Sequence, residues 1–557
     1  MKTNFKKPLL FLGLIIIINI VSSFIFIRFD LTSDKRFTLT DVSKTIIDKI
    51  TNPIYVDVYL TGALPADFKK LETETKQILD EFQALSTNIV YRFIDVSKQE
   101  DNNQTLIKEL FKKGMAPQNV TVSEKGKQSQ LMVFPWATIN YKGKESNVLL
   151  LKNIMGASTE DKVLGSVQNL EYAFAEGFNK VLSDKKKTVA IIKGNGETAD
   201  IKIAKFLLQT RESYHIAPFT LDSVAKNPEK TAVALQKYDL AIVAKPTEKF
   251  TDAEKQVIDQ YIIHGGKAIF LIDQVNIDLQ NLYNLEGQSL AAPRDLNLED
   301  MFFKYGVRIN PSIIKDELGT PIKLATGEAG SQTQFQEFNW KYAPFIVSDS
   351  KHPTVKNLGG LKFDFANPIE ILKNDIQKTV LLHSSIDSKP VGTPTIIGLN
   401  AVNDTLNLAQ YQGIGNMPVA VLLEGKFKSV FENRVLGFKD PDFKTSYKKS
   451  QIIVISDGNI IENELDKNGI PVELGYDPKS GNLFDNKDFL QNAVNFLLDD
   501  SGIINLRTKD FSLPLLDKEN VTAEYGQSQL KGILFPLLIL MIFGITFYSI
   551  RKKRYAR

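Results

Sequence analysis

Two long runs of apolar residues lie near the two ends of the chain. Residues 8–27 (PLLFLGLIIIINIVSSFIFI) and residues 533–550 (ILFPLLILMIFGITFYSI) contain no charged side chain. At ~1.5 Å per helical residue, each run is close to the thickness of a hydrocarbon core of about 30 Å. We therefore predict two membrane-spanning helices. The alternatives are a cleaved secretory signal for the first run and a buried core helix for either, but basic residues flank both runs.

The residues after the first run alternate between strand and helix patterns, which predicts a small α/β unit that begins with a βαβ motif. The predicted elements are strands at residues 54–60 and 89–96, a helix at 67–84 between them, a charged helix at 104–113, and strands at 120–122, 131–141 and 147–151. Their order resembles a thioredoxin-like fold. The Cys-x-x-Cys motif of that fold's redox chemistry is absent, and we expect Pro117 to follow an ordinary trans peptide bond.

A long amphipathic helix is predicted to join this unit to a second α/β domain. Its apolar stripe recurs at steps of three and four: Val163, Val167, Leu170, Phe174, Phe178 and Val181. Beyond it, apolar strand patterns occupy residues 188–192, 238–244, 267–273 and 451–457. Thr251 and Glu254 predict a capping box at the start of a helix that Gly265 and Gly266 end. Strands that alternate with helices indicate a mainly parallel sheet covered on both faces.

The predicted fold class is α/β, with two membrane helices on either side of a large central region. The expected boundaries are a basic tail (1–7), a first membrane helix (8–28), a thioredoxin-like domain (29–158), a linking helix (159–186), an α/β domain with a long irregular insertion (187–500), a polar stalk (501–531), a second membrane helix (532–550) and a basic tail (551–557).

Charge is distributed unevenly along the chain, although the net charge is only +3. Nine of the 68 basic residues lie in residues 1–7 and 531–557, which contain no acid, so the rest holds 59 basic against 65 acidic residues. A mildly acidic central region argues against nucleic acid as a partner. Because positive charge is retained on the cytoplasmic side, we expect both termini in the cytoplasm and the central region in the periplasm of a bacterial inner membrane.

No motif of a known catalytic chemistry is present in the sequence. The chain has no cysteine, no Gly-Lys pair followed by Ser or Thr, and no H-E-x-x-H or G-x-S-x-G sequence. Thiol catalysis and a P-loop ATPase are thereby excluded, and we expect no catalytic residue, metal or cofactor.

One loop is a candidate ligand site. Gly194, Asn195, Gly196 and Glu197 follow a predicted strand and precede a predicted helix, which is where open α/β sheets place ligands. The alternative is a tight turn that needs glycine dihedrals, with Glu197 at a helix N-terminus. Asp273 and Asp457 also end strands, but two isolated acids do not establish a metal site.

The membrane runs contain candidate partner contacts. Asn19, Ser22 and Ser23 are spaced at i, i+3 and i+4, so they share one face of the first helix, and a lipid-facing amide would be left unpaired. Gly544 in the second helix allows close approach of another backbone. We expect these positions to contact a permease or the other span of this chain. The alternative is that the Ser side chains bond back to their own helix.

Several short motifs in collinear order resemble the GldG family, gliding-motility-associated auxiliary proteins of ABC transporters in Bacteroidota. They are RFDLTSDKRFTLT (28–40), GNGE (194–197), YGVRIN (305–310), WKYAP (340–344), His352-Pro353, residues 453–458 and LLDK (515–518). The resemblance implies a subunit that works with a separate ABC permease and, through it, a separate ATPase. It also implies a central domain similar to the GIFT domain, a relative of class I glutamine amidotransferases. Their cysteine nucleophile is absent here, and Asn195 replaces the family's usual His.

Two functions of different classes follow from these observations. The first is a non-catalytic, membrane-anchored binding or scaffold subunit, in contact with the lipid bilayer and with a homodimer as a further option. The second is a periplasmic cell-envelope hydrolase or transferase that uses carboxylates, an enzyme class that leaves little trace in sequence. The missing nucleophile motif favours the first.

Overall fold

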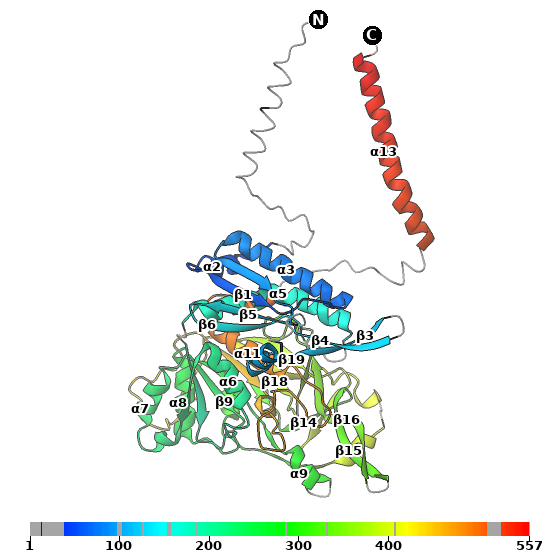
Figure 1. Cartoon of the computed structure of the whole chain (residues 1–557). Helices are drawn as coiled ribbons and strands as arrows, with labels where there is room; N and C mark the ends of the chain where they lie inside the picture. Colours follow the sequence, from blue (N-terminus) through cyan, green and yellow to red (C-terminus); the bar gives the residue numbers. More distant parts are fainter. Residues whose placement is uncertain are drawn as a thin grey trace. The chain divides into compact units, whose positions relative to one another are not determined.

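The computed structural model describes Gly13 and residues 38–96, 103–124, 127–152, 157–184, 187–284, 287–329, 332–405, 408–508 and 525–555. The chain divides into two compact units, Met1–Lys509 and Asp510–Arg557. The first unit contains an N-terminal α/β region and a larger central region, and the second contains one long helix (Figure 1).

The N-terminal region contains the predicted βαβ motif. Its elements are α2 (Asp41–Ile47), β1 (Ile54–Val58), α3 (Ala66–Leu85), β2 (Ile89–Phe93), α4 (Asn103–Lys112), β3 (Gln118–Glu124), β4 (Lys127–Val133), β5 (Trp136–Tyr141), β6 (Lys144–Leu149) and α5 (Thr159–Leu182). Four strands form a sheet in the order β2-β1-β5-β6, in which β1 and β2 are parallel while β5 is antiparallel to its neighbours. β3 and β4 form a separate hairpin.

The helix that the sequence predicts as a link packs against the sheet of this N-terminal region. All six residues of its predicted stripe are buried. Phe174 and Phe178 of α5 contact Phe82 of α3 edge to face, and a Cβ on Gly177 would lie 2.8 Å from the side chain of Ile139 in β5. α5 is therefore a core helix as well as a connection.

Two prolines of this region, Pro135 and Pro117, bear on the sequence predictions. The single strand expected at residues 131–141 is two strands, because Pro135 stands between β4 and β5 and has no N–H to donate to a ladder. In the described part of the chain, the cis peptide bond is Thr393–Pro394, so Pro117 follows a trans bond as expected.

The central region is built on the predicted, mainly parallel sheet. Its strands and helices are β7 (Thr188–Lys193), α6 (Ala204–Ser213), β8 (His215–Thr220), α7 (Pro228–Leu235), β9 (Leu240–Ala244), α8 (Asp252–Ile263), β10 (Lys267–Leu271), β19 (Gln377–His383), β22 (Pro418–Gly425), β23 (Ser450–Ile455) and α11 (Asn486–Leu498). The order is β19-β22-β23-β10-β9-β7-β8. The five strands from β23 to β8 are parallel, and β22 is antiparallel to both of its neighbours.

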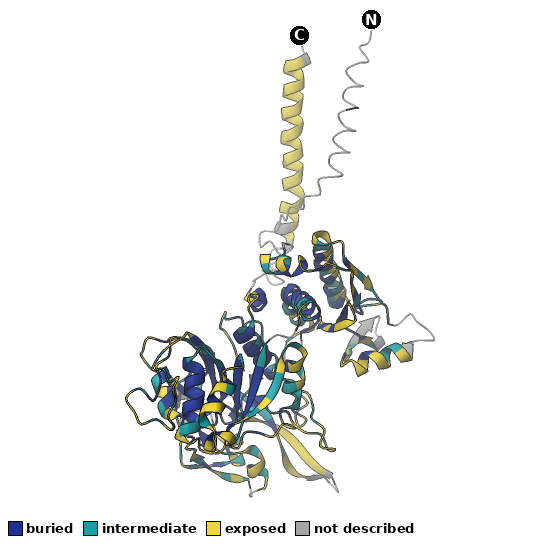
Figure 2. Cartoon of the chain, turned by 90° about the vertical axis from the view of Figure 1, so that its left-hand side faces the viewer, coloured by how far each residue is buried: buried dark blue, intermediate teal, exposed yellow. Residues whose placement is uncertain are grey.

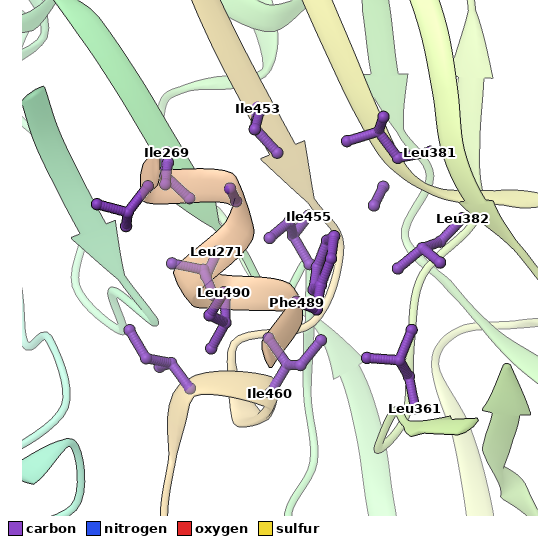
Figure 3. Close-up of a cluster of buried hydrophobic side chains, with 14 of the residues drawn as sticks. Ile269, Leu271, Leu361, Leu381, Leu382, Ile453, Ile455, Ile460, Phe489 and Leu490 are labelled. Carbon is purple, nitrogen blue, oxygen red and sulfur yellow. The ribbon is translucent and has the colours of Figure 1, made fainter. Parts of the chain in front are cut away.

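Helices cover both faces of this sheet, as the strand pattern predicts. Ile269 and Leu271 of β10 point to the face that α11 covers with Phe489 and Leu490 (Figure 3). Phe270, between them, points to the opposite face and packs with the apolar stripe of α8. Thr251 and Glu254 form the predicted capping box of α8. Each fully buried Ile, Leu or Phe side chain of these two cores stabilises the fold by about 1.5–3 kcal/mol relative to an exposed position.

The insertion between β10 and β22 is more regular than the sequence indicates. It contains β11 (Val275–Asn276), α9 (Leu279–Asn284), β12 (Gln288–Pro293), α10 (Glu299–Tyr305), β13 (Val307–Ile309), β14 (Ser312–Asp316), β15 (Gly319–Ala329), β16 (Gln332–Val347), β17 (Gly360–Lys362), β18 (Ile369–Ile371), β20 (Ser388–Gly392) and β21 (Thr395–Gly398) besides β19. Many of these strands pair with partners distant in sequence, such as β12 with β21. Trp340 lies at 1% exposure in the insertion's own core.

The end of the first unit differs from the predicted stalk. Residues Ile503–Thr508 form the 3₁₀ helix η5, in which Ile503, Ile504, Leu506 and Arg507 are buried. In the second unit, α13 (Tyr525–Tyr555) contains the second apolar run, and its residues 529–554 are exposed (Figure 2). The segment Gln529–Arg554 is long and apolar enough to cross a membrane, and it contains an 18-residue window with a mean hydropathy of 2.4. The first predicted span lies outside the described residues except for Gly13.

Candidate functional site at the carboxyl edge of the central sheet

Four parallel strands, β7, β9, β10 and β23, end at the same edge of the central sheet. Because β10 and β23 are neighbours, the two acids that follow them lie in one cluster. The N–H of Gly458, next to Asp457, donates to Asp273 Oδ1 at 2.5 Å. The sequence identifies each acid as a strand end, and the sheet order brings them together.

Lys245 is the cation of this cluster and was missed by the sequence analysis. It follows β9 directly and has a φ of 56°, in the left-handed region that a non-glycine residue occupies at a cost of about 1–2 kcal/mol. Its ammonium lies 2.9 Å from Glu462 Oε2 and also donates to Asn459 Oδ1. Burial opposes the charge on Lys245, but the carboxylates of Glu462 and Asp273 outweigh burial and raise its pKa.

Asp457 is fully buried, and both of its oxygens accept hydrogen bonds. Oδ2 accepts the N–H of Asp364 at 2.7 Å, and Oδ1 accepts the N–H and the side-chain amide of Asn459 at 2.7 and 3.0 Å. Burial raises the pKa of Asp457 and of Asp273, and the neighbouring carboxylates raise that of Asp457 further. The charged groups of the cluster therefore bond to other groups of the same chain, and these bonds hold the ends of β9, β10 and β23 together.

The candidate ligand loop is tied to its neighbours in the same way. The buried Asn195 accepts the N–H of Thr247 at 3.0 Å and that of Glu248 at 2.9 Å with its carbonyl oxygen, and its side-chain amide donates to Glu254 Oε2 at 3.1 Å. Gly196 has a φ of 68°, and a Cβ there would lie 2.2 Å from Thr247 Oγ1. The loop after β7 thus joins the loop after β9 and the first turn of α8.

The expected position of Glu197 at a helix N-terminus is wrong. α6 begins only at Ala204, because the N–H of Thr198 bonds to the carbonyl of Ala244 at 3.2 Å and draws the chain across the end of β9 before a helix can start. Glu197 Oε2 accepts the N–H of Asn195 at 2.9 Å instead, and burial raises the pKa of Glu197.

The acids at this edge are not arranged as the ligands of a metal ion. Among the described residues, no three or more His, Asp or Glu side chains are arranged to hold a metal ion. His264, His352 and His383 each bond to a neighbour in its own segment, namely Gln260, Thr354 and Ser384. The arrangement supports rigid connection of loops more directly than proton transfer or metal binding.

The predicted membrane contacts are only partly described. Gly544 lies in the apolar part of α13, with no atom within 4 Å of the place a Cβ would take. Asn19, Ser22 and Ser23 lie outside the described residues.

The sequence did contain a signal for the missed residues. Lys245 is a charged residue placed directly after β9, whose five residues are all buried. Glu462 comes seven positions after the end of β23, in which five of the six residues are buried. Charged side chains at the carboxyl ends of parallel strands share one edge of a sheet, so both could have been added to Asp273 and Asp457.

A curated relative matches almost the whole chain. A protein of Borreliella burgdorferi, described as uncharacterized, is 22% identical over 560 aligned residues, which cover 94% of each chain. Two solved structures resemble parts of the fold. The N-terminal domain of mmIFT52 has a TM-score of 0.32 at 13% identity and covers 59% of this chain and all of its own. A ThuA-like protein from Parabacteroides merdae has a TM-score of 0.27 at 9% identity and covers 57% of this chain and 91% of its own.

Two family models match the chain, and they fall on the two α/β regions. Residues 33–140 match a family described as a domain of unknown function (DUF7088). Residues 186–493, which span β7 to α11 and all the loops of the strand-end cluster, match the family described as an ABC-type uncharacterized transport system. Because this second match covers more than half of the 557 residues, the chain belongs to that ABC-type transport family.

Proposed function

We propose that the chain is a membrane-anchored, non-catalytic subunit of an ABC transporter complex, with its main domain in the periplasm and a binding or scaffold role. Membership of the transport family indicates an accessory subunit of such a complex. The non-catalytic role rests on one observation: the edge where open α/β sheets place ligands is occupied by the chain's own bonded network around Lys245. The domain there presents a rigid shape rather than reactive groups.

In this proposal the loop from Gly194 to Glu197 is a structural connection between β7, β9 and α8. The contacts of Asn195 with Thr247, Glu248 and Glu254 support that role. The alternative of a carboxylate-based envelope hydrolase has less support, because Asp457 is 0% exposed and holds two backbone N–H groups.

The proposed placement in the membrane uses both apolar runs. α13 continues as a helix into Arg551, Lys552, Lys553 and Arg554, and basic residues at the end of an apolar helix favour a cytoplasmic position. The first run, with Lys2, Lys6 and Lys7 before it, would then place the N-terminus on the same side. Both termini are therefore proposed to be cytoplasmic.

We also propose that the chain has the finer fold and role that its motifs resemble. The βαβ motif and the strand order β2-β1-β5-β6 support a thioredoxin-like N-terminal region, and the doubly wound central sheet supports a GIFT-type domain. On this view the chain resembles GldG and serves gliding motility, beside a separate permease and ATPase, as a monomer or a homodimer.

Purification from native membranes tests the function. A tagged full-length chain, solubilised in mild detergent, should retain a multi-span permease and an ABC ATPase, and a chain shortened before α13 should retain less of both. If the full-length chain retains neither subunit while an unrelated membrane complex stays intact in the same extract, the proposed function fails.

A further inference from the structure

Residues near the two ends of the described part of the first unit contact two consecutive residues of α5. Thr40 lies near the beginning of its described part and Arg507 near its end, and Glu171 and Tyr172 contact them. In sequence, the apolar run at residues 8–27 precedes Thr40, and α13 follows Arg507. Each contact therefore involves a residue close in sequence to one of the two apolar segments.

Glu171 holds the N-terminal end. Its carboxylate is 4% exposed, and Oε1 accepts hydrogen bonds from the N–H of Thr40 at 2.8 Å, the hydroxyl of Thr40 at 2.9 Å and the hydroxyl of Ser43 at 2.7 Å. Thr40 is also the N-cap of α2. These three hydrogen bonds connect the beginning of the described part of the first unit directly to α5.

Tyr172 and the central region hold the C-terminal end together. The guanidinium of Arg507 is 5.1 Å from the centroid of the Tyr172 ring, and Arg507 is 4% exposed. Its Nε donates to the carbonyl of Pro353 at 3.2 Å, and Nη2 donates to that of Lys356 at 2.8 Å. Arg507 thus links α5 to the turn that begins at His352-Pro353.

Two further contacts join α5 and its neighbours to the central region. Lys152, which follows β6, donates to the carbonyl of Asn357 at 2.6 Å in the same turn. One helical turn after Tyr172, Glu176 accepts the side-chain amide of Asn495 in α11 at 3.4 Å. α5 is therefore in contact with Thr40 and Ser43 near one end of the described part of the first unit, with Arg507 near its other end, and with the central region.

We propose that α5 couples the segment at Thr40, which follows the first apolar run, to the segment at Arg507, which precedes α13, and both of them to the central region. A displacement of one segment then changes the packing of the other. Glu171 and Tyr172 are consecutive residues in the middle of a 24-residue helix. Two consecutive residues of a helix move together as a rigid body. Ser43, Glu171 and Arg507, which make these contacts, are buried side chains with polar groups, so a shift leaves donors or acceptors unpaired instead of sliding one apolar surface over another. This coupling rests on the proposed function, since it assumes that both runs enter the membrane.

Hydrogen exchange of the full-length chain in lipid nanodiscs tests the coupling. Ser43→Ala removes one donor to Glu171, and Glu171→Gln keeps the shape of the side chain while it removes the charge. Both variants should speed amide exchange at residues 353–358, the turn that Arg507 and Lys152 contact, by about tenfold. The control Lys44→Ala removes the exposed ion pair with Asp41 in the same helix and should leave residues 353–358 unchanged.

The reciprocal variant completes the test. Arg507→Lys retains the charge but loses the planar group over Tyr172, and it should speed exchange in α2. Faster exchange confined to α2 in Ser43→Ala and Glu171→Gln, with residues 353–358 within twofold of the native chain, would overturn the coupling. If Glu171→Gln does not fold, Ser43→Ala decides. A chain that shows the coupling but retains no ABC subunit would refute the proposed function and leave the coupling intact.

Discussion

Replacement of Lys245 by methionine tests whether the strand-end cluster is held together by a buried ion pair. Lys245→Met keeps most of the side-chain volume and removes the ammonium that lies 2.9 Å from Glu462 Oε2. The side chains of Lys245 and Glu462 are 14% and 16% exposed, so water replaces the lost partner poorly. Removing one partner of a buried pair costs about 3–5 kcal/mol.

A matched control is available on the same glutamate. Lys202 lies 3.9 Å from Glu462 Oε1, but its side chain is 48% exposed. Exposed pairs contribute about 0.2–1 kcal/mol, so Lys202→Met should cost less than about 1 kcal/mol. The comparison separates the effect of burial from that of charge.

The loss of unfolding free energy in Lys245→Met, called the deficit below, should depend on pH in a definite direction. Burial already raises the pKa of Asp273, and Lys245 lowers it, so the variant raises that pKa further. A carboxyl whose pKa is higher in the folded than in the unfolded chain stabilises the fold at low pH, and this stability is lost as pH rises through the folded value. The deficit should therefore be large at pH 7.5 and shrink toward pH 4.

Urea unfolding of the full-length chain in detergent measures both effects through the fluorescence of Trp340, which is buried in the insertion. With an m value of about 3 kcal/mol/M, the midpoint of Lys245→Met should fall by about 1–1.7 M at pH 7.5. Equal midpoints for Lys245→Met and Lys202→Met, or a deficit that does not change between pH 4 and 7.5, would refute the reasoning.

Four further predictions concern the membrane segments, nucleotide and the candidate ligand loop. A reporter active only in the periplasm should be silent when fused to the C-terminus, and activity there would reverse the proposed topology. The purified chain should not bind ATP at micromolar concentration, since it has no P-loop, and calorimetric binding would contradict this. Membrane hydrogen bonds average only ~0.6 kcal/mol, so Asn19→Leu alone should weaken assembly only modestly, whereas Asn19→Leu combined with Gly544→Leu should clearly reduce co-purification with the permease. The control is Gly532→Leu, on another face of α13. Gly196→Ala should lower the melting temperature more than Gly413→Ala: both glycines have positive φ, but only at Gly196 does a Cβ meet another atom, and equal shifts would show that the close approach does not matter.

Local patterns in the sequence determined most of the elements. The capping box of α8, the apolar stripe of α5 and the strands around residues 188–192 and 267–273 all appear where the sequence predicts them. Each depends on residues within a few positions of one another, because side-chain periodicity and capping hydrogen bonds are local. The same holds for the apolar run of α13, whose length and composition are read directly.

Only the tertiary structure decided which distant residues meet. Asp273 and Gly458 are 185 positions apart, and Thr40 and Glu171 are 131 apart, yet each pair shares a hydrogen bond. Sheet order places β23 beside β10. The packing of η5 against α5 and the turn at Pro353 buries Arg507, which sequence alone assigned to a polar stalk. The start of α6 was likewise moved by a bond to Ala244 on another strand. Buried polar groups must find partners wherever the fold brings them, and a sequence window of a few residues contains no information about those partners.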